Sequence, residues 1–135
     1  MTDYRFSIRV YWEDTDAGGV VYYANYLRFF ERARTEWLRT LGVAQQRLRE
    51  DDGVIFIVSE STVRYLRPAR LDDRLDVTVA VRECGRASLS LAQQAWRGDE
   101  RLAEGEIRIG CVDTDSFKPR RIPTELLEGL APSPR

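Results

Sequence analysis

One long amphipathic segment, at about residues 24–41, constrains the fold more than any other feature of this 135-residue sequence. At about 1.5 Å per residue, a helix of this length is about 25 Å long, enough to cross a whole sheet. Gly42 is placed to end it. Its apolar side chains recur at spacings of three and four residues, which puts them on one helix face: Tyr26, Phe29, Phe30, Ala33, Trp37 and Leu41.

The rest of the chain shows the alternation of apolar and polar residues that is typical of strands. Short turns between the later strands favour antiparallel pairing, and a single long helix must cover one face of the resulting sheet. The sequence therefore predicts an α+β fold in a single domain over residues 1–135, with a partner subunit over the surfaces left open. The predicted strands are residues 4–12, 54–66, 74–82, 86–97 and 101–113, and a short helix is predicted at 124–130.

Composition removes several classes of function. The sequence has no histidine, so Ser-His-Asp and Cys-His catalysis and histidine zinc sites are excluded. Cys84 and Cys111 form no CxxC pair and are interpreted as small buried residues. We expect no metal site and no cofactor. The net charge of −1 argues against a nucleic-acid partner, and the lack of a long apolar run or signal peptide predicts a cytoplasmic protein without a membrane span.

The stretch EDTDAGGVVYY, residues 13–23, is the strongest candidate for chemistry. Asp16 lies a few residues before the start of the long helix, where backbone N–H groups lack partners and carry partial positive charge. Gly18 and Gly19 let a backbone approach a ligand closely. A carboxylate beside such N–H groups could activate water or attack a carbonyl, while the N–H groups stabilise the developing oxyanion. A turn followed by a helix cap is the alternative interpretation.

Other polar and aromatic residues of this stretch have simpler interpretations. Asn25 is predicted to cap the helix. Glu13 and Asp14 could form a metal pair only with further ligands, so they are interpreted as solvated strand-end carboxylates or ion-pair partners. Tyr22 could line a substrate pocket or serve as a core or interface aromatic residue.

The segment DTDAGGVVYYANYLRFFERARTEWL resembles the signature of hotdog-fold acyl-CoA thioesterases. It is similar to the hydroxybenzoyl-CoA thioesterase group, and most of all to its YbgC branch, which is associated with the Tol-Pal system. The segments RPARLDD and CVDTDSFKPRRIP resemble further parts of that branch. The resemblance covers about residues 5–125.

This resemblance implies a hotdog fold, an antiparallel sheet wrapped around one long central helix. It also implies homodimers that pair their sheets side by side and often join into homotetramers, with acyl thioesters hydrolysed at the protomer interface. The aspartate of its D-x-x-G-x-V element corresponds to Asp16, and the backbone N–H that polarises the carbonyl corresponds to Tyr23. Gly19, Val20 and Tyr22 are then expected to contact substrate. Many YbgC-type members carry histidine at the position of Tyr23.

The carrier arm of the substrate is expected to need arginine, since coenzyme A is rich in phosphate. Related thioesterases often contact the nucleotide at the strand start that here contains Arg86 and Ser88. A solvated surface arginine is the alternative for Arg86. The acyl chain and the choice between coenzyme A and acyl carrier protein stay open. A hydratase is disfavoured because familiar ones use histidine, whereas a non-catalytic acyl-binding or scaffold protein remains the alternative function.

Overall fold

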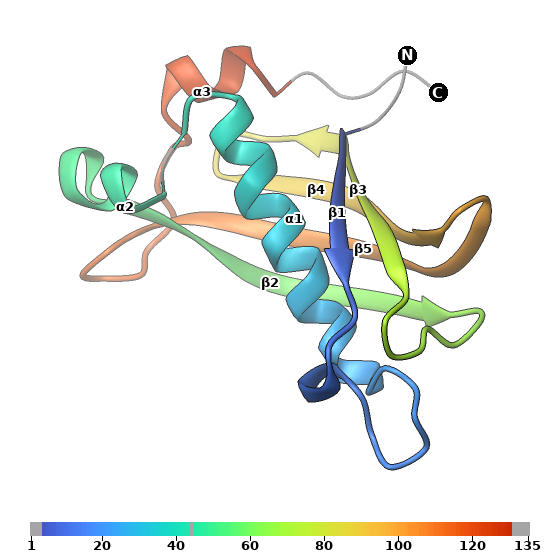
Figure 1. Ribbon diagram of the computed structural model, residues 1–135. Helices are drawn as coiled ribbons and strands as arrows, with labels where there is room; N and C mark the ends of the chain where they lie inside the picture. The colour runs from blue at the N-terminus through green and yellow to red at the C-terminus, as the bar shows by residue number, and fades with distance from the viewer. Residues whose placement is uncertain (1–3, 44, 131–135) are drawn as a thin grey trace.

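The computed structural model describes residues 4–43 and 45–130, and its strands form one antiparallel sheet (Figure 1). The strand order is β1-β3-β4-β5-β2, so β1 and β2 are the two edges. All four pairs of neighbours are antiparallel. The predicted strand segments are therefore confirmed, with these bounds: β1 Tyr4–Arg9, β2 Val54–Tyr65, β3 Arg74–Cys84, β4 Ser88–Arg97 and β5 Glu100–Asp113.

The predicted long helix is present as a 3-10 turn, Tyr23–Asn25, that continues into α1, Tyr26–Thr40. It lies across one face of the sheet (Figure 1). Gly42 ends it with a φ of 81°, a conformation that favours glycine. The apolar stripe is buried as predicted except at its end, where Leu41 is 36% exposed and Leu38 is buried in its place.

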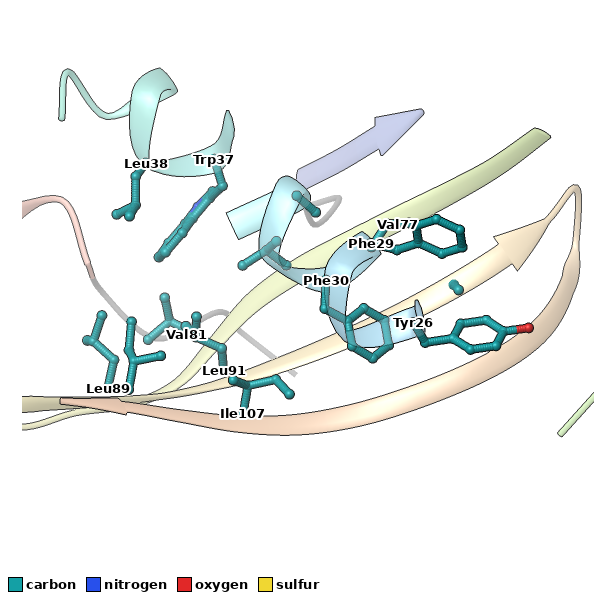
Figure 2. Packing of buried hydrophobic residues seen from close by; sticks show 14 of the residues in the cluster. Tyr26, Phe29, Phe30, Trp37, Leu38, Val77, Val81, Leu89, Leu91 and Ile107 are labelled. Carbon is teal, nitrogen blue, oxygen red and sulfur yellow. The ribbon is translucent and has the colours of Figure 1, made fainter. Parts of the chain in front are cut away.

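Two phenylalanines of α1 anchor the helix to the sheet. Phe29 and Phe30 are fully buried, and burial of each side chain stabilises the fold by about 1.5–3 kcal/mol. Figure 2 shows Phe30 directed from α1 toward the part of the sheet that carries Leu91 and Ile107. The ring also lies close to Gly105 of β5, where an added Cβ would be 3.0 Å from Phe30 Cε2. A glycine at this point of the sheet leaves room for the close approach of the Phe30 ring.

The first strand is shorter than predicted. β1 ends at Arg9, and Val10 closes its pairing with hydrogen bonds to the backbone of Asp72 and Asp73. A 3-10 turn, Trp12–Asp14, then redirects the chain, because the Asp14 carboxylate accepts the Tyr11 N–H at 2.8 Å. Trp12, the last residue of the predicted strand, is 79% exposed.

Two segments outside the sheet complete the described fold. Residues 45–53, predicted only as a polar connection, contain α2, Gln45–Arg47, and a π-helical turn, Leu48–Asp52. Leu48 is the sole buried residue of that turn, which leaves too little periodicity for a helix prediction. The short predicted C-terminal helix is confirmed as α3, Thr124–Glu128.

The two cysteines differ in burial. Cys111 is buried as expected, and Cys84 is half-buried. Burial raises the pKa of both thiols above the usual value. Neither side chain is therefore an ionised nucleophile at neutral pH.

Candidate active site

The loop that contains Asp16 connects the 3-10 turn Trp12–Asp14 to the start of the long helix and extends away from that helix (Figure 1). Three backbone hydrogen bonds close it: Tyr22 N–H to Asp14 C=O at 2.9 Å, Asp16 N–H to Val20 C=O at 2.9 Å, and Gly19 N–H to Asp16 C=O at 3.0 Å. Gly19 has a φ of 78°, which favours glycine. Asp16 therefore lies near the tip of a hairpin that leads into the helix, two residues further out than Asp14, which pairs with Tyr22.

The Asp16 side chain is exposed on this loop. One carboxylate oxygen, Oδ1, accepts the Gly18 N–H at 2.8 Å, so the side chain has a fixed direction. Among residues 4–43 and 45–130, no basic side chain forms an ion pair with it. The bond to Gly18 is that of an ordinary turn. It also holds an exposed carboxylate in place, with Oδ2 lacking a protein partner within the described ranges, which suits a base or nucleophile.

The start of the helix has open backbone donors. Tyr22 is extended, with φ −60° and ψ 130°, and no side chain caps the 3-10 turn that follows. Within the described ranges, the N–H groups of Tyr23 and Ala24 have no hydrogen-bond acceptor. Because such N–H groups point out along the helix axis, they can bind the oxygen of a carbonyl.

The predicted role of Asn25 as a capping side chain is wrong. Asn25 stands at the N-cap position of α1, but its side chain makes no capping bond. Its amide instead donates to Asp14 Oδ1 at 2.7 Å, and both residues are buried. The short 3-10 turn before α1 moves Asn25 past the position from which a cap could reach the first open N–H groups.

Asp14 connects the loop to the helix start. Its side chain is only 4% exposed, and its two oxygens accept the Tyr11 N–H and the Asn25 amide. It is therefore a buried structural carboxylate rather than the solvated or ion-paired residue expected. Sequence reasoning missed this because Asp14 and Asn25 are 11 residues apart and only the folded loop brings them together. The bond fixes the Asp16 loop relative to the helix start.

A cluster of tyrosines surrounds the helix start, made of Tyr22, Tyr23, Tyr26 and Tyr65. The rings of Tyr22 and Tyr23 are 4.9 Å apart between centroids, and Tyr65 meets Tyr23 edge-on at 6.1 Å. Tyr65, at the end of β2, also donates its phenol hydrogen to the Tyr23 C=O at 3.1 Å. Partial burial, with a contribution from Tyr23, raises the pKa of Tyr65, so its phenol keeps its proton at neutral pH. The sequence placed Tyr65 in a strand and gave no reason to connect it with the site.

Arg86 and Ser88 lie far from Asp16 within one protomer. Arg86 is in the turn between β3 and β4, where its C=O accepts the Ile122 N–H at 2.7 Å. The Asp16 loop adjoins the other end of β3, since Val20 pairs with Arg70 just before that strand begins. β3 has 11 residues, which makes it about 35 Å long. The structure therefore gathers Asp16, Gly19, Val20, Tyr22 and Tyr23 but leaves Arg86 and Ser88 at the opposite end of the sheet.

A metal-binding cluster and a membrane-spanning helix are both absent from the described residues. No three histidine, cysteine, aspartate or glutamate side chains within residues 4–43 and 45–130 are grouped to hold a metal ion. Over the same residues, none of the helices has both the length and the apolar character needed to cross a membrane.

Comparisons with known proteins identify the family. The profile of the Thioesterase-like superfamily matches residues 10–130. The chain belongs to the thioesterase-like superfamily. The acyl-CoA thioesterase YbgC of Haemophilus influenzae is 45% identical over 123 residues, which cover 91% of this chain and 90% of the relative. The acyl-CoA thioester hydrolase YbgC of Escherichia coli O157:H7 is 43% identical over 127 residues, covering 93% of this chain and 94% of that protein.

A solved structure agrees with this assignment to the thioesterase-like superfamily. A probable thioesterase from Bartonella henselae superposes with a TM-score of 0.87 at 34% sequence identity, covering 90% of this chain and 100% of that one. The hotdog fold and the YbgC-like resemblance expected from the sequence are confirmed. The expected enzyme class, a thioester hydrolase, is confirmed as well.

Proposed function

We propose that this thioesterase hydrolyses an acyl-CoA to a free acid and coenzyme A, with Asp16 as general base or nucleophile. The observation that carries the proposal is an exposed carboxylate on the loop that leads directly into an uncapped helix start, with the base of that loop tied to the helix by the buried Asp14–Asn25 bond. The substrate class is supported by YbgC relatives that are named acyl-CoA thioesterases.

In the proposed reaction, the thioester carbonyl oxygen accepts the Tyr23 N–H, which stabilises the negative charge that develops on that oxygen. Asp16 either takes a proton from an attacking water molecule or attacks the carbonyl carbon itself. The C–S bond then breaks, and the thiolate of coenzyme A leaves and is protonated. Where Asp16 has attacked the carbonyl, a water molecule then hydrolyses the acyl-aspartate anhydride, which releases the acid and restores the carboxylate. Gly19, Val20 and Tyr22, which lie between these two groups in the sequence, would contact the acyl group or the thioester.

The proposed assembly is a homo-oligomer, either a dimer or a tetramer built from dimers. β2 is a 12-residue edge strand, and Ile57 and Val58 on it are exposed. Pairing of two such edges would satisfy the open backbone groups and cover these side chains. Arg86 and Ser88 would then bind the phosphates of coenzyme A at the site of another protomer, which accounts for their distance from Asp16 within one chain.

A non-catalytic acyl-binding protein is the competing function, and one observation favours it. The Asp16 bond to Gly18 is an ordinary turn interaction, and it would fully explain Asp16 if that residue only stabilised the loop.

An acyl carrier protein could replace coenzyme A as carrier under either function. We further propose that residues 1–135 act as one domain in the cytoplasm.

The test is thiol release from acyl-CoA substrates that differ in chain length and aromaticity. We expect Asp16→Asn to keep the fold but lose about 10²- to 10⁴-fold in turnover, the range for loss of a general base. Asp99→Asn removes a carboxylate from another exposed turn and is expected to keep wild-type turnover. Undiminished hydrolysis by Asp16→Asn would refute the assignment. Tight acyl-CoA binding by wild-type protein without thiol release would support the non-catalytic alternative.

A single turnover in ¹⁸O-labelled water tests whether Asp16 is the nucleophile. A general base directs solvent oxygen into the released acid, so the label is found in that product. A nucleophile forms an acyl-aspartate anhydride, and water that attacks the aspartyl carbonyl of this anhydride leaves the label in the Asp16 carboxylate, whereas attack at its acyl carbonyl labels the acid. Label in Asp16 therefore identifies a nucleophile, and label in the acid alone is compatible with both roles. Mass spectrometry of the acid and of the peptide that contains Asp16 measures both.

A further inference from the structure

Two neighbouring peptide units at the helix start each have a hydrogen-bonded C=O and an N–H without an acceptor among the described residues. The unit between Tyr22 and Tyr23 has its C=O bonded by the Asn25 N–H at 2.8 Å. The unit between Tyr23 and Ala24 has its C=O bonded by the Tyr65 phenol at 3.1 Å and by the Tyr26 N–H. In a trans peptide the N–H points opposite to the C=O. Each unit is therefore held by its carbonyl on one side and presents an open N–H on the other.

The phenol of Tyr65 is the side-chain contact that fixes the second of these units. It comes from β2, 42 residues further along the chain, so it ties the helix start to the sheet. The Tyr65 ring packs against Tyr23 and Tyr26, with centroid distances of 6.1 and 5.5 Å. A hydrogen bond to a peptide C=O also polarises the N–H of the same peptide, because linked hydrogen bonds strengthen one another.

We propose that Tyr65 is a positioning residue that orients and polarises the Ala24 N–H as a second donor to the thioester oxygen, beside the Tyr23 N–H. This inference rests on the proposed function and adds to it a second donor and the residue that holds it. Two donors can bind both lone pairs of the developing oxyanion. Tyr65 itself does not contact the reacting atoms and acts only through the peptide that it holds.

Tyr65→Phe tests the inference because it removes the phenol oxygen and keeps the ring. We expect kcat to fall about 2- to 10-fold, the effect of losing one neutral hydrogen bond, while KM changes less than about twofold and the melting temperature stays near that of wild type. Tyr4→Phe, which removes a phenol oxygen from β1, is expected to leave kcat unchanged. An unchanged kcat in Tyr65→Phe, or a loss seen only in KM, would overturn the inference.

A spectroscopic measurement tests the same point without turnover. The probe is an acyl-CoA ketone analogue with CH₂ in place of the thioester sulfur and ¹³C at its carbonyl, bound to wild-type protein and to Tyr65→Phe. Donors to the carbonyl oxygen lower its infrared stretching frequency, so we expect a smaller downward shift in Tyr65→Phe. Equal shifts in the two proteins would overturn the role of Tyr65 but would leave the proposed function standing. Full hydrolysis by Asp16→Asn would instead overturn the proposed function, whatever the Tyr65 result.

Discussion

At the scale of single residues, the candidate site depends on which backbone groups are bonded and which stay open. The Tyr23 N–H is open because Tyr22 is extended and offers no cap. A proline at position 23 would fit this geometry, since an extended residue precedes it and the first helical position suits proline. Such a change removes the N–H and keeps the helix.

We therefore expect Tyr23→Pro to lose about 10²- to 10³-fold in kcat, the effect of losing one oxyanion donor. Tyr23→Ala is the matched control because it removes the ring and keeps the N–H, and it is expected to retain most of the turnover. Circular dichroism checks that both variants fold. Equal losses in the two variants would assign the effect to the Tyr23 side chain and contradict a role for its N–H.

Sequence alone placed Asp16 on a loop that leads into a helix, because the two glycines and the long amphipathic pattern mark such a loop, and it left a turn with a helix cap as the alternative. The proposed roles of Asp16 and Tyr23 came from the resemblance to thioesterases. The roles of two further residues, Asp14 and Tyr65, could not be found from the sequence. Asp14 is recognised only when the loop brings it to Asn25, and Tyr65 only when β2 passes beside the helix start. The Asp14–Asn25 and Tyr65–Tyr23 contacts follow neither the helix nor the strand period, so no local sequence pattern predicts them.

At the scale of elements, the contact between α1 and β5 depends on Gly105. Phe30 of α1 is fully buried against it, and an added Cβ would lie 3.0 Å from the ring. We expect Gly105→Ala to destabilise the protein by about 1–3 kcal/mol, since a packed core resists the shift that is needed. Gly110→Ala, on the same strand, is the control because its Cβ would have its nearest neighbour at 4.0 Å.

Urea unfolding measures both glycine variants, and the expected result is a lower midpoint for Gly105→Ala alone. A midpoint equal to wild type in Gly105→Ala would show that Phe30 can move aside.

The end of the first strand could not be predicted from the sequence pattern. The apolar alternation continued to Trp12, but the Asp14 carboxylate bonded the Tyr11 N–H and ended the strand early.

At the scale of the whole molecule, the two sheet edges differ in charge. The β1 edge carries Arg5 and Arg9, which discourage pairing with another strand. The β2 edge has no charge from Val54 to Ser59 and exposes Ile57 and Val58. The sequence predicted an oligomer from the surfaces that one helix leaves open, but only the strand order identifies β2 as the long open edge.

We expect Val58→Lys to shift the protein toward monomer at micromolar concentration, because it places a charge in the proposed pairing edge. Ser7→Lys, on the β1 edge, is expected to keep the wild-type mass. Sedimentation or light scattering after gel filtration measures both variants. A wild-type protein that is already monomeric, or a Val58→Lys variant with the wild-type mass, would contradict β2 pairing.

Tyr65 ends the strand whose outer side is the open edge, and its phenol reaches the helix start. The β2 backbone and the Tyr65 side chain therefore link the edge where a second copy would dock to the Tyr23 carbonyl. A docked copy that stiffens this strand would also steady the Ala24 N–H, so dilution that separates the subunits would lower the specific rate. In such an enzyme, assembly and turnover are coupled through the Tyr65 side chain as well as through the Arg86 and Ser88 that another protomer would supply.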